Sequence, residues 1–416
     1  MNQAVLTETP PTNEVSVPAA TSPATTSSPV RLTSIDAYRG FVMALMMGEV
    51  LNFGRVAANL PDSQFWKFLA YHQSHVSWIG CSLHDLIQPS FSFLVGVALP
   101  FSMASRAARG QSKSLTTVHV LWRALVLVLL GVFLRSVHRP QTNWTFEDTL
   151  SQIGLGYPVL YLIGNLRRRD QWIAFGLLEI GYWLAFALYP LPGPDFDYSR
   201  VGVEPGWPHL LTGFAAHWNK NGNLAWAFDT WFLNLFPRAK PFIDNDGGYA
   251  TLSFIPTLAT MVLGLVAGQV LRDERPPLKK IKFLAVAGLV SLIGGALIGW
   301  LGVCPVVKRI WTPSWVLFSG GWCFLIMAGA YAVIDYKRMA RWSFPLVVVG
   351  MNSIAAYCIA HLFEDFVQVA LRKHISKGFF LVLGKPFEPF VFGLTTLFVF
   401  WLMLYWLYRK KIFIRI

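Results

Sequence analysis

The character of the chain changes within residues 71–102, which read YHQSHVSWIGCSLHDLIQPSFSFLVGVALPFS. A polar, histidine-containing stretch passes there directly into an apolar run. About 20 apolar residues cross a hydrocarbon core of roughly 30 Å as a helix, and runs of that length recur along the sequence. The sequence therefore predicts an all-α, polytopic integral membrane protein with about ten transmembrane helices. The expected spans are 36–54, 85–105, 116–136, 150–166, 171–190, 251–271, 282–302, 314–335, 343–363 and 389–408.

The composition supports this class and excludes others. Of the 416 residues, 54% are hydrophobic and only 14% are charged, against about 25% charged in soluble domains. The segments do not alternate in the short strands of a membrane β-barrel. A net charge of +13 suggests nucleic acid in a soluble protein, but here the basic residues lie between spans, so we expect no nucleic-acid partner. The four cysteines form no CxxC pair, and we interpret them as core residues.

The distribution of basic residues predicts the orientation in the bilayer. More than half of the 35 lysines and arginines lie in the N-terminal tail, the even-numbered connections and the C-terminus. Basic residues favour the cytoplasmic side, so both termini are expected to be cytoplasmic. The loop that carries His72 and His75 and the long loop 191–250 then face outward. Residues 1–30 are rich in Ser, Thr, Pro and Ala and are expected to form a disordered cytoplasmic tail rather than a signal peptide.

The loop 191–250 is unusually long and aromatic for a connection between spans. Its aromatic rings suit stacking on sugar faces, and they equally suit packing within the loop or an interfacial belt. Both interpretations stay open. The tryptophans concerned are Trp207, Trp218, Trp226 and Trp231.

His75 is the principal candidate for catalysis. An imidazole takes up a proton near neutral pH, which suits a general base, and it can also accept an acyl group itself. Asp85, at the start of the second span, can orient the imidazole or hold an amino group, or it can simply favour the helix N-terminus. The alternative for His75 is an interfacial hydrogen bond. A metal site formed with His72 lacks a third ligand.

Further polar residues lie in or beside the apolar spans, where such groups usually face a cavity or a partner. Arg39 forms an ion pair with Asp36 or binds phosphate. Arg123 snorkels to the interface or reaches an anionic ligand. The remaining candidates are Glu49 and Asn52 in the outer half of the first span, and Asn352 and His361, which lie about 13 Å apart along one helix.

Taken together, the motifs of this sequence resemble those of the heparan-α-glucosaminide N-acetyltransferase family of transmembrane acyltransferases. The resemblance extends from about residue 31 to the end of the chain. It depends on several motifs in a fixed order, any of which would be weak alone. The strongest are RLTSIDAYRG, HVSWIG followed by HDLIQPSFSFLVG, VVGMNSIAAYCIAHLFED and LYRKKIF; the weaker ones are LWRALVLVLLGVF, LSQIGLGY and TLATMVLGLVAGQVL.

The resemblance implies that residues 31–416 form one transmembrane acyltransferase domain with a periplasmic loop at 191–250. It implies transfer of an acetyl group from cytoplasmic acetyl-CoA to an amino sugar on the other side of a bacterial inner membrane, without a metal. The histidine of HVSWIG, His75, becomes the catalytic residue, with Asp85 beside it. We assign the other candidates to acetyl-CoA (Arg39, Arg123, Asn352 and His361) and to the acceptor sugar (Asn52, Glu49 and Trp78).

The chain also departs from the family pattern. LSQIG has Ser151 and Gln152 where Gln and Arg are usual, and Glu49 introduces a carboxyl at a usually apolar position. These departures concern the identity of the acceptor more than the reaction type. An O-acyltransferase of an envelope glycan and a secondary transporter of sugars remain the alternative functions. The oligomeric state is open, with a homodimer as one candidate.

Overall fold

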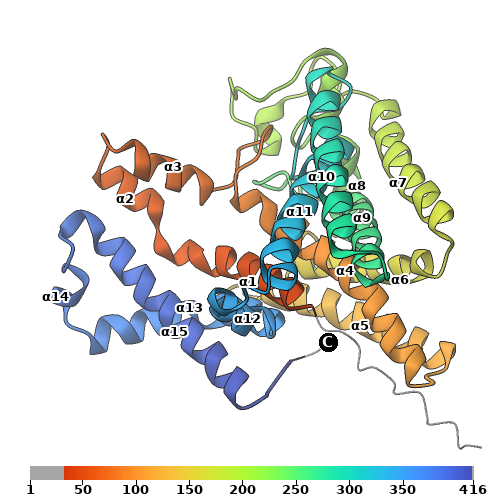
Figure 1. Ribbon diagram of the computed structural model, residues 1–416. Helices are drawn as coiled ribbons and strands as arrows, with labels where there is room; N and C mark the ends of the chain where they lie inside the picture. The colour runs from red at the N-terminus through yellow and green to blue at the C-terminus, as the bar shows by residue number, and fades with distance from the viewer. Residues whose placement is uncertain (1–31, 415–416) are drawn as a thin grey trace, which may run out of the picture. The chain divides into compact units, whose positions relative to one another are not determined.

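The computed structural model describes residues 32–414, so the tail expected at 1–30 lies outside the described residues. The described part is helical (Figure 1), with one isolated antiparallel bridge between Ile79 and Val307. The principal helices are α1 (Thr33–Met47), α2 (Phe53–Asn59), α3 (Gln64–His72), α4 (Ile87–Ala108), α5 (Lys113–Leu134), α6 (Thr149–Gly164), α7 (Arg168–Leu188), α8 (Leu224–Phe232), α9 (Phe254–Arg272), α10 (Pro277–Trp300), α11 (Pro313–Ala330), α12 (Phe344–Gly350), α13 (Ser353–His374), α14 (Lys377–Phe380) and α15 (Glu388–Arg409).

The predicted class, a polytopic membrane protein of about ten helices, is confirmed. Among residues 32–414, nine helices are long and apolar enough to cross a membrane. The expected span 150–166 corresponds to α6, whose 16 residues extend over only about 24 Å. This helix packs against α5 and α9. It begins where the buried Asp148 side chain accepts a hydrogen bond from the Leu150 N–H, as expected of an N-cap residue.

α9 lies at the centre of the helix packing, and 83% of its apolar segment is buried. It contacts α4, α6, α7 and α11, and Figure 1 shows it beside α10 and α11. Two glycines allow α4 and α9 to approach closely. A Cβ on Gly96 would lie 1.9 Å from the Met261 carbonyl oxygen, and one on Gly264 would lie 1.9 Å from that of Phe93. Small residues at such contacts are typical of membrane helices.

Two of the expected spans are interrupted in ways that the hydropathy did not predict. α1 ends at Met47, a 3-10 turn (η1, Gly48–Leu51) follows, and Asn52 adopts a left-handed conformation before α2. The span expected at 343–363 is displaced. The chain forms the short α12, breaks at Asn352, and continues as α13 to His374, so the apolar pattern placed this helix about ten residues too early.

The surfaces of α5, α7 and α10 that face away from the bundle are apolar. They expose large side chains such as Trp122, Leu177, Ile180, Val290 and Ile293. Only 17% of the apolar segment of α10 and 22% of that of α7 is buried. Such extensive apolar surface is expected where helices contact lipid rather than water.

Candidate functional site

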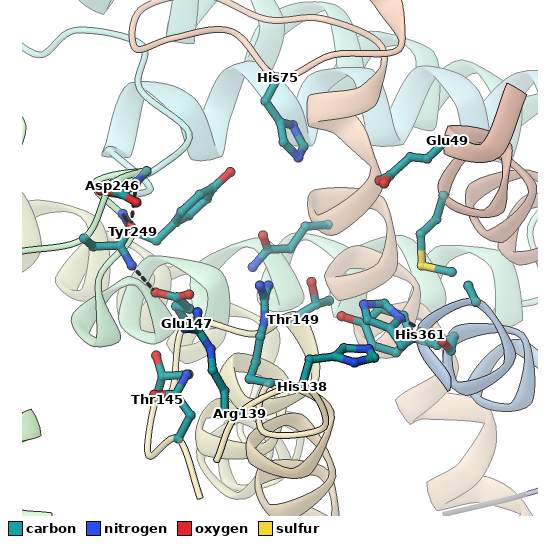
Figure 2. Close-up of a pocket in the computed structure, with 18 of the residues that line it drawn as sticks. Glu49, His75, His138, Arg139, Thr145, Glu147, Thr149, Asp246, Tyr249 and His361 are labelled. Atoms are coloured by element: carbon teal, nitrogen blue, oxygen red, sulfur yellow. Dashed lines mark hydrogen bonds between the residues drawn. The ribbon is translucent and has the colours of Figure 1, made fainter. Parts of the chain in front are cut away.

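A cavity of about 1230 Å³ opens where several of the interhelical connections meet (Figure 2). Its walls come from η1, the start of α4, the connection between α5 and α6, the end of loop 191–250, the connection between α10 and α11, and the middle of α13. Some of these segments are connections between helices, and the distribution of basic residues places all of those connections on the outward face. Loops and spans far apart in the sequence therefore form one site at this end of the bundle.

His75 lines the cavity from the loop between α3 and the 3-10 turn η2 (His84–Leu86). Its Nδ1 lies 2.8 Å from Oδ1 of Asp85, which is buried in η2. An ionised carboxylate only accepts hydrogen bonds, so Nδ1 carries the hydrogen and donates it to Asp85. Nε2 is then the basic ring nitrogen, which is the arrangement that a general base requires.

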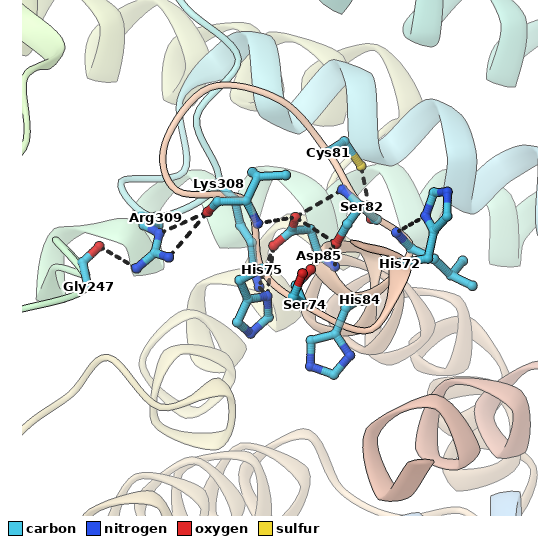
Figure 3. Close-up of polar contacts among 12 residues, drawn as sticks. His72, Ser74, His75, Cys81, Ser82, His84, Asp85, Gly247, Lys308 and Arg309 are labelled. Carbon is cyan, nitrogen blue, oxygen red and sulfur yellow. Dashed lines mark hydrogen bonds and ion pairs between the residues drawn. The ribbon is translucent and has the colours of Figure 1, made fainter. Parts of the chain in front are cut away.

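The Asp85 carboxylate has several further donors (Figure 3). Its Oδ2 accepts hydrogen bonds from the Ser82 N–H at 3.0 Å, the Ser82 hydroxyl at 3.0 Å and the Val76 N–H at 3.2 Å. The loop that carries His75 is thus folded around this carboxylate. Gly80 has a φ of 123°, a value that favours glycine, and its N–H donates to the Val306 carbonyl.

Lys308 and Arg309 complete this cluster from the connection between α10 and α11. Nζ of Lys308 lies 3.3 Å from Asp85 Oδ1 and 3.0 Å from His75 Nδ1. Arg309 donates two hydrogen bonds to the Val76 carbonyl and one to that of Gly247. Neither residue was predicted from the sequence. The available signal was a basic pair within the otherwise apolar outward connection VCPVVKRIW.

The surroundings shift the pKa values of His75 and Lys308 in the same direction. Burial lowers the pKa of His75 below its ordinary value of 6.5; the Asp85 hydrogen bond opposes this, and the Lys308 charge adds to it. Burial also lowers the pKa of Lys308 to about 8, despite the attraction of Asp85. The lowered pKa of His75 favours the neutral imidazole.

A second histidine–carboxylate pair lies beside the first. Nε2 of His84 is 2.8 Å from Oε1 of Glu49, and the His84 and His75 rings have centroids 4.6 Å apart. Figure 2 shows the Glu49 carboxylate and the His75 ring both directed into the cavity. Glu49 was predicted to bind substrate, and the sequence grouped His84 with His75 and Asp85 at the membrane boundary without assigning it a role of its own. Two imidazoles and two carboxylates thus converge on one wall.

The wall opposite His75 is rich in charged side chains. Nε of Arg135 lies 3.1 Å from Oδ2 of the buried Asp148, which also accepts a hydrogen bond from the Tyr357 hydroxyl at 2.9 Å. Glu147 accepts a hydrogen bond from Asn245, and burial raises the pKa of its carboxyl. The other charged groups that line the cavity are Arg139, Arg238, Lys240, Asp244, Asp246, Glu364 and Asp365.

The structure brings four of the nine predicted site residues together. His75, Glu49 and His361 line the cavity, and Asp85 lies directly behind His75. The His361 ring stacks on Tyr357, with ring centroids 4.3 Å apart, and its Nδ1 is 2.9 Å from the Tyr357 carbonyl oxygen.

The other predicted residues do not line this cavity. Asn52 bonds to the Val50 carbonyl at the turn after η1. Trp78 is fully buried and donates to the Trp218 carbonyl, so it supports the wall from behind.

Three of the four residues assigned to acetyl-CoA lie deeper in the bundle. Arg39 pairs with Asp36 at 3.6 Å, Arg123 donates to the Tyr157 hydroxyl, and Asn352 bonds to the backbone of Ile412 and Ile414. Arg39 and Arg123 lie on helices, and Asn352 directly precedes one, that lead toward the cavity. The separations to the cavity-lining residues Glu49, Arg135 and His361 are about 15, 18 and 13 Å along the helix axes.

Loop 191–250 packs against the bundle and also contributes to the cavity. Trp218 is buried, Trp226 donates to the Ile243 carbonyl, and a cation–π contact joins Lys220 to Trp207. Trp231 remains exposed. The cavity-facing part of the loop is its charged end, Arg238 to Tyr249. Packing therefore accounts for most of the tryptophans.

The comparisons with known proteins agree with the resemblance seen in the motifs. No family model matches the chain. The chain is 27% identical over 429 residues to heparan-alpha-glucosaminide N-acetyltransferase of Homo sapiens, which covers 93% of this chain and 60% of the human protein. It is 26% identical over 431 residues to the protein of that name from Mus musculus, which covers 94% of this chain and 61% of the mouse protein. The chain thus spans about 60% of the length of these relatives.

Proposed function

Homology to the heparan-alpha-glucosaminide N-acetyltransferases supports membership of this chain in that family, and from this premise we propose that it is an acyltransferase. It moves an acetyl group from acetyl-CoA to the amino group of a glucosamine-type sugar. The observation that carries the proposal is the His75–Asp85 pair, with Nδ1 and Oδ1 2.8 Å apart, at the wall of a cavity large enough for a sugar.

The chemical step assigns a role to each member of the pair. The acceptor nitrogen attacks the thioester carbonyl carbon, the C–S bond breaks, and its electron pair leaves on the CoA sulfur. His75 Nε2 takes the proton that the amine loses, and Asp85 orients the ring and stabilises the imidazolium. Glu49 and His361 line the same cavity and are assigned to the acceptor amine and to the donor's acyl end.

The donor reaches this site from the other side of the bilayer. The proposed membrane is the bacterial inner membrane, with both termini in the cytoplasm. Two observations support this route. The cavity is built largely from connections that the positive-inside rule places outward, and Arg39, Arg123 and Asn352 lie deeper along the helices that reach it. A cytoplasmic nucleotide end and an outward thioester would then be joined by the long pantetheine arm.

The test of reaction class uses purified protein, labelled acetyl-CoA and two acceptors. Glucosamine should become acetylated, whereas N-acetylglucosamine, which has hydroxyls but no free amine, should not. Acetylation of both sugars would favour O-acyl transfer. Passage of unmodified glucosamine into proteoliposomes without acetyl-CoA would favour a transporter and contradict the proposal.

A covalent route through acetyl-His75 is the alternative mechanism. It predicts that labelled acetyl groups remain on the protein when the acceptor is omitted. Direct transfer predicts an unlabelled protein and a rate that depends on both substrates together.

A further inference from the structure

Lys308 occupies an unusual position for a lysine. Its side chain is buried. Its ammonium lies against the Asp85 carboxylate and the His75 ring, and these two groups are themselves only 2.8 Å apart. A buried lysine is costly unless it is paired. Asp85 supplies the pairing charge, and it is the same oxygen, Oδ1, that accepts the hydrogen bond from His75.

The shared oxygen determines how the hydrogens are arranged. Nδ1 cannot donate to Asp85 and also accept from Lys308. The opposite tautomer would place the Nδ1 lone pair against a carboxylate oxygen at 2.8 Å, which is repulsive. Nδ1 therefore donates to Oδ1, and Lys308 forms an ion pair with the same oxygen at 3.3 Å. The 3.0 Å separation between Lys308 Nζ and His75 Nδ1 then brings a positive charge close to the imidazole. That charge opposes protonation of the ring.

The connection between α10 and α11 holds Lys308 in place. The Ile79–Val307 bridge and the hydrogen bond from the Gly80 N–H to the Val306 carbonyl join this connection to the His75 loop. The Thr312 hydroxyl donates to the Pro305 carbonyl and accepts from the Val307 N–H. These contacts fix the backbone on both sides of Lys308. The position of its ammonium beside Asp85 therefore does not depend on the flexible side chain alone.

The remaining charged and titratable groups near this cluster come from every element that packs around it. His84 stacks beside His75, and Glu49 pairs with His84. Cys81 lies in the His75 loop with its thiol near the Ser82 carbonyl. On the other side are Arg309 and Tyr249, joined by a cation–π contact. Among these groups, Lys308 is the cation whose charged nitrogen lies within hydrogen-bond distance of the His75 ring.

We propose that Lys308 is a positioning residue for His75: it shares Asp85 with the imidazole and keeps the ring neutral so that Nε2 is free to accept a proton. The role as a base rests on the proposed acetyl transfer, whereas the effect of the lysine charge on the ring does not. The two can therefore be tested separately.

The first test measures the ring directly. Diethyl pyrocarbonate reacts with neutral imidazole, so the rate of His75 modification, followed by peptide mass spectrometry across pH, reports the fraction of neutral ring. Lys308→Met should move the midpoint for His75 upward by about one pH unit, because a neighbouring charge within a few ångströms shifts a titration by one to three units. Lys308→Arg, which keeps the charge, should restore the wild-type midpoint.

Lys240→Met provides the matched control, because it removes a cation that lines the same cavity and should leave the midpoint unchanged. An unchanged midpoint in Lys308→Met would overturn the proposal. An equal upward shift in Lys308→Arg would also overturn it, because packing rather than charge would then be responsible.

The second test measures acetyl transfer. In Lys308→Met the acid limb of the kcat/KM profile should move upward together with the modification midpoint, and activity should recover at higher pH. A uniform loss of activity with no movement of that limb would overturn the proposed role. If the wild type transfers no acetyl group, the proposed function fails, while the modification midpoint still decides whether Lys308 keeps the ring neutral.

Discussion

At the scale of single residues, Asp85 is the centre of the site. Its two oxygens accept hydrogen bonds from His75, Ser82 and Val76 and form an ion pair with Lys308, so it fixes the imidazole and the fold of the loop together. Replacing it by asparagine retains the size but presents a neutral group that no longer fixes the tautomer or balances the imidazolium.

We predict that Asp85→Asn lowers kcat for acetyl transfer by about 10²–10⁴-fold, the usual contribution of a general base, with a smaller effect on KM. Steady-state kinetics at saturating acetyl-CoA measures this. Asp246→Asn alters another cavity carboxyl and serves as the control. A KM effect with unchanged kcat would indicate that Asp85 binds substrate instead.

The pH dependence of the wild type follows from the lowered pKa of His75. The ring must be neutral to accept a proton, so kcat/KM should fall as the pH decreases through that pKa. Because burial and Lys308 lower it from 6.5, the acid midpoint should lie below about 6.5. A pH–rate profile with its acid midpoint above 7 would contradict this electrostatic account.

The sequence predicted part of the site at this scale. His75 and Asp85 are ten positions apart in a distinctive stretch, so their local spacing could be interpreted. Lys308 is 233 positions from His75, and no local pattern distinguishes it from other basic residues in outward connections. Glu49 was identified because a carboxyl in an apolar span is costly, but its pairing with His84 is visible only in the fold.

At the scale of elements, close helix packing depends on specific glycines. Gly96→Ala should destabilise the protein by about 1–3 kcal/mol, the usual cost of overpacking, because its Cβ would meet the Met261 carbonyl of α9 at 1.9 Å. Gly181→Ala in α7, where a Cβ meets no atom within 4 Å, should be neutral or slightly stabilising. Thermal unfolding in detergent would compare them, and equal effects would contradict the packing shown here.

A buried carboxyl joins α8 to the start of α9. Asp229 accepts a hydrogen bond from the Thr251 N–H at 2.8 Å, and burial raises the pKa of Asp229 to about 7. A raised pKa means that the stability contributed by the protonated form is complete below about pH 3.8 and is lost as the pH rises through 7. The wild type should therefore lose stability relative to Asp229→Asn between pH 5 and pH 8. If the melting temperatures of the two proteins changed in parallel between pH 5 and pH 8, the raised pKa of Asp229 would be disproved.

Hydropathy predicted most helices but not their ends. It identified the apolar runs that became α4, α5, α7, α9, α10, α11 and α15. It placed one span at 343–363, whereas α13 continues to His374 and turns Glu364 and Asp365 toward the cavity. The apolar pattern did not indicate that these charged residues belong within the helix. They are accommodated there because they face the cavity, which is a feature of the tertiary structure.

At the scale of the whole molecule, transfer across the bilayer requires the cavity and the basic connections to lie on opposite sides of the membrane. Single-cysteine variants test this with an impermeant maleimide on intact cells. Ser376→Cys, in the connection after α13, should label from outside. Gln111→Cys, between α4 and α5, should label only after the membrane is opened. The parent protein controls for native cysteines, and the reverse pattern would invert the proposed topology.

The most direct measurement is the transfer of label from acetyl-CoA to glucosamine by the purified wild type, by His75→Ala and by His138→Ala. The last variant removes another cavity histidine and serves as the matched control. The account predicts transfer by the wild type and by His138→Ala, and its loss in a folded His75→Ala protein that still binds acetyl-CoA. Undiminished transfer by His75→Ala would contradict the central claim.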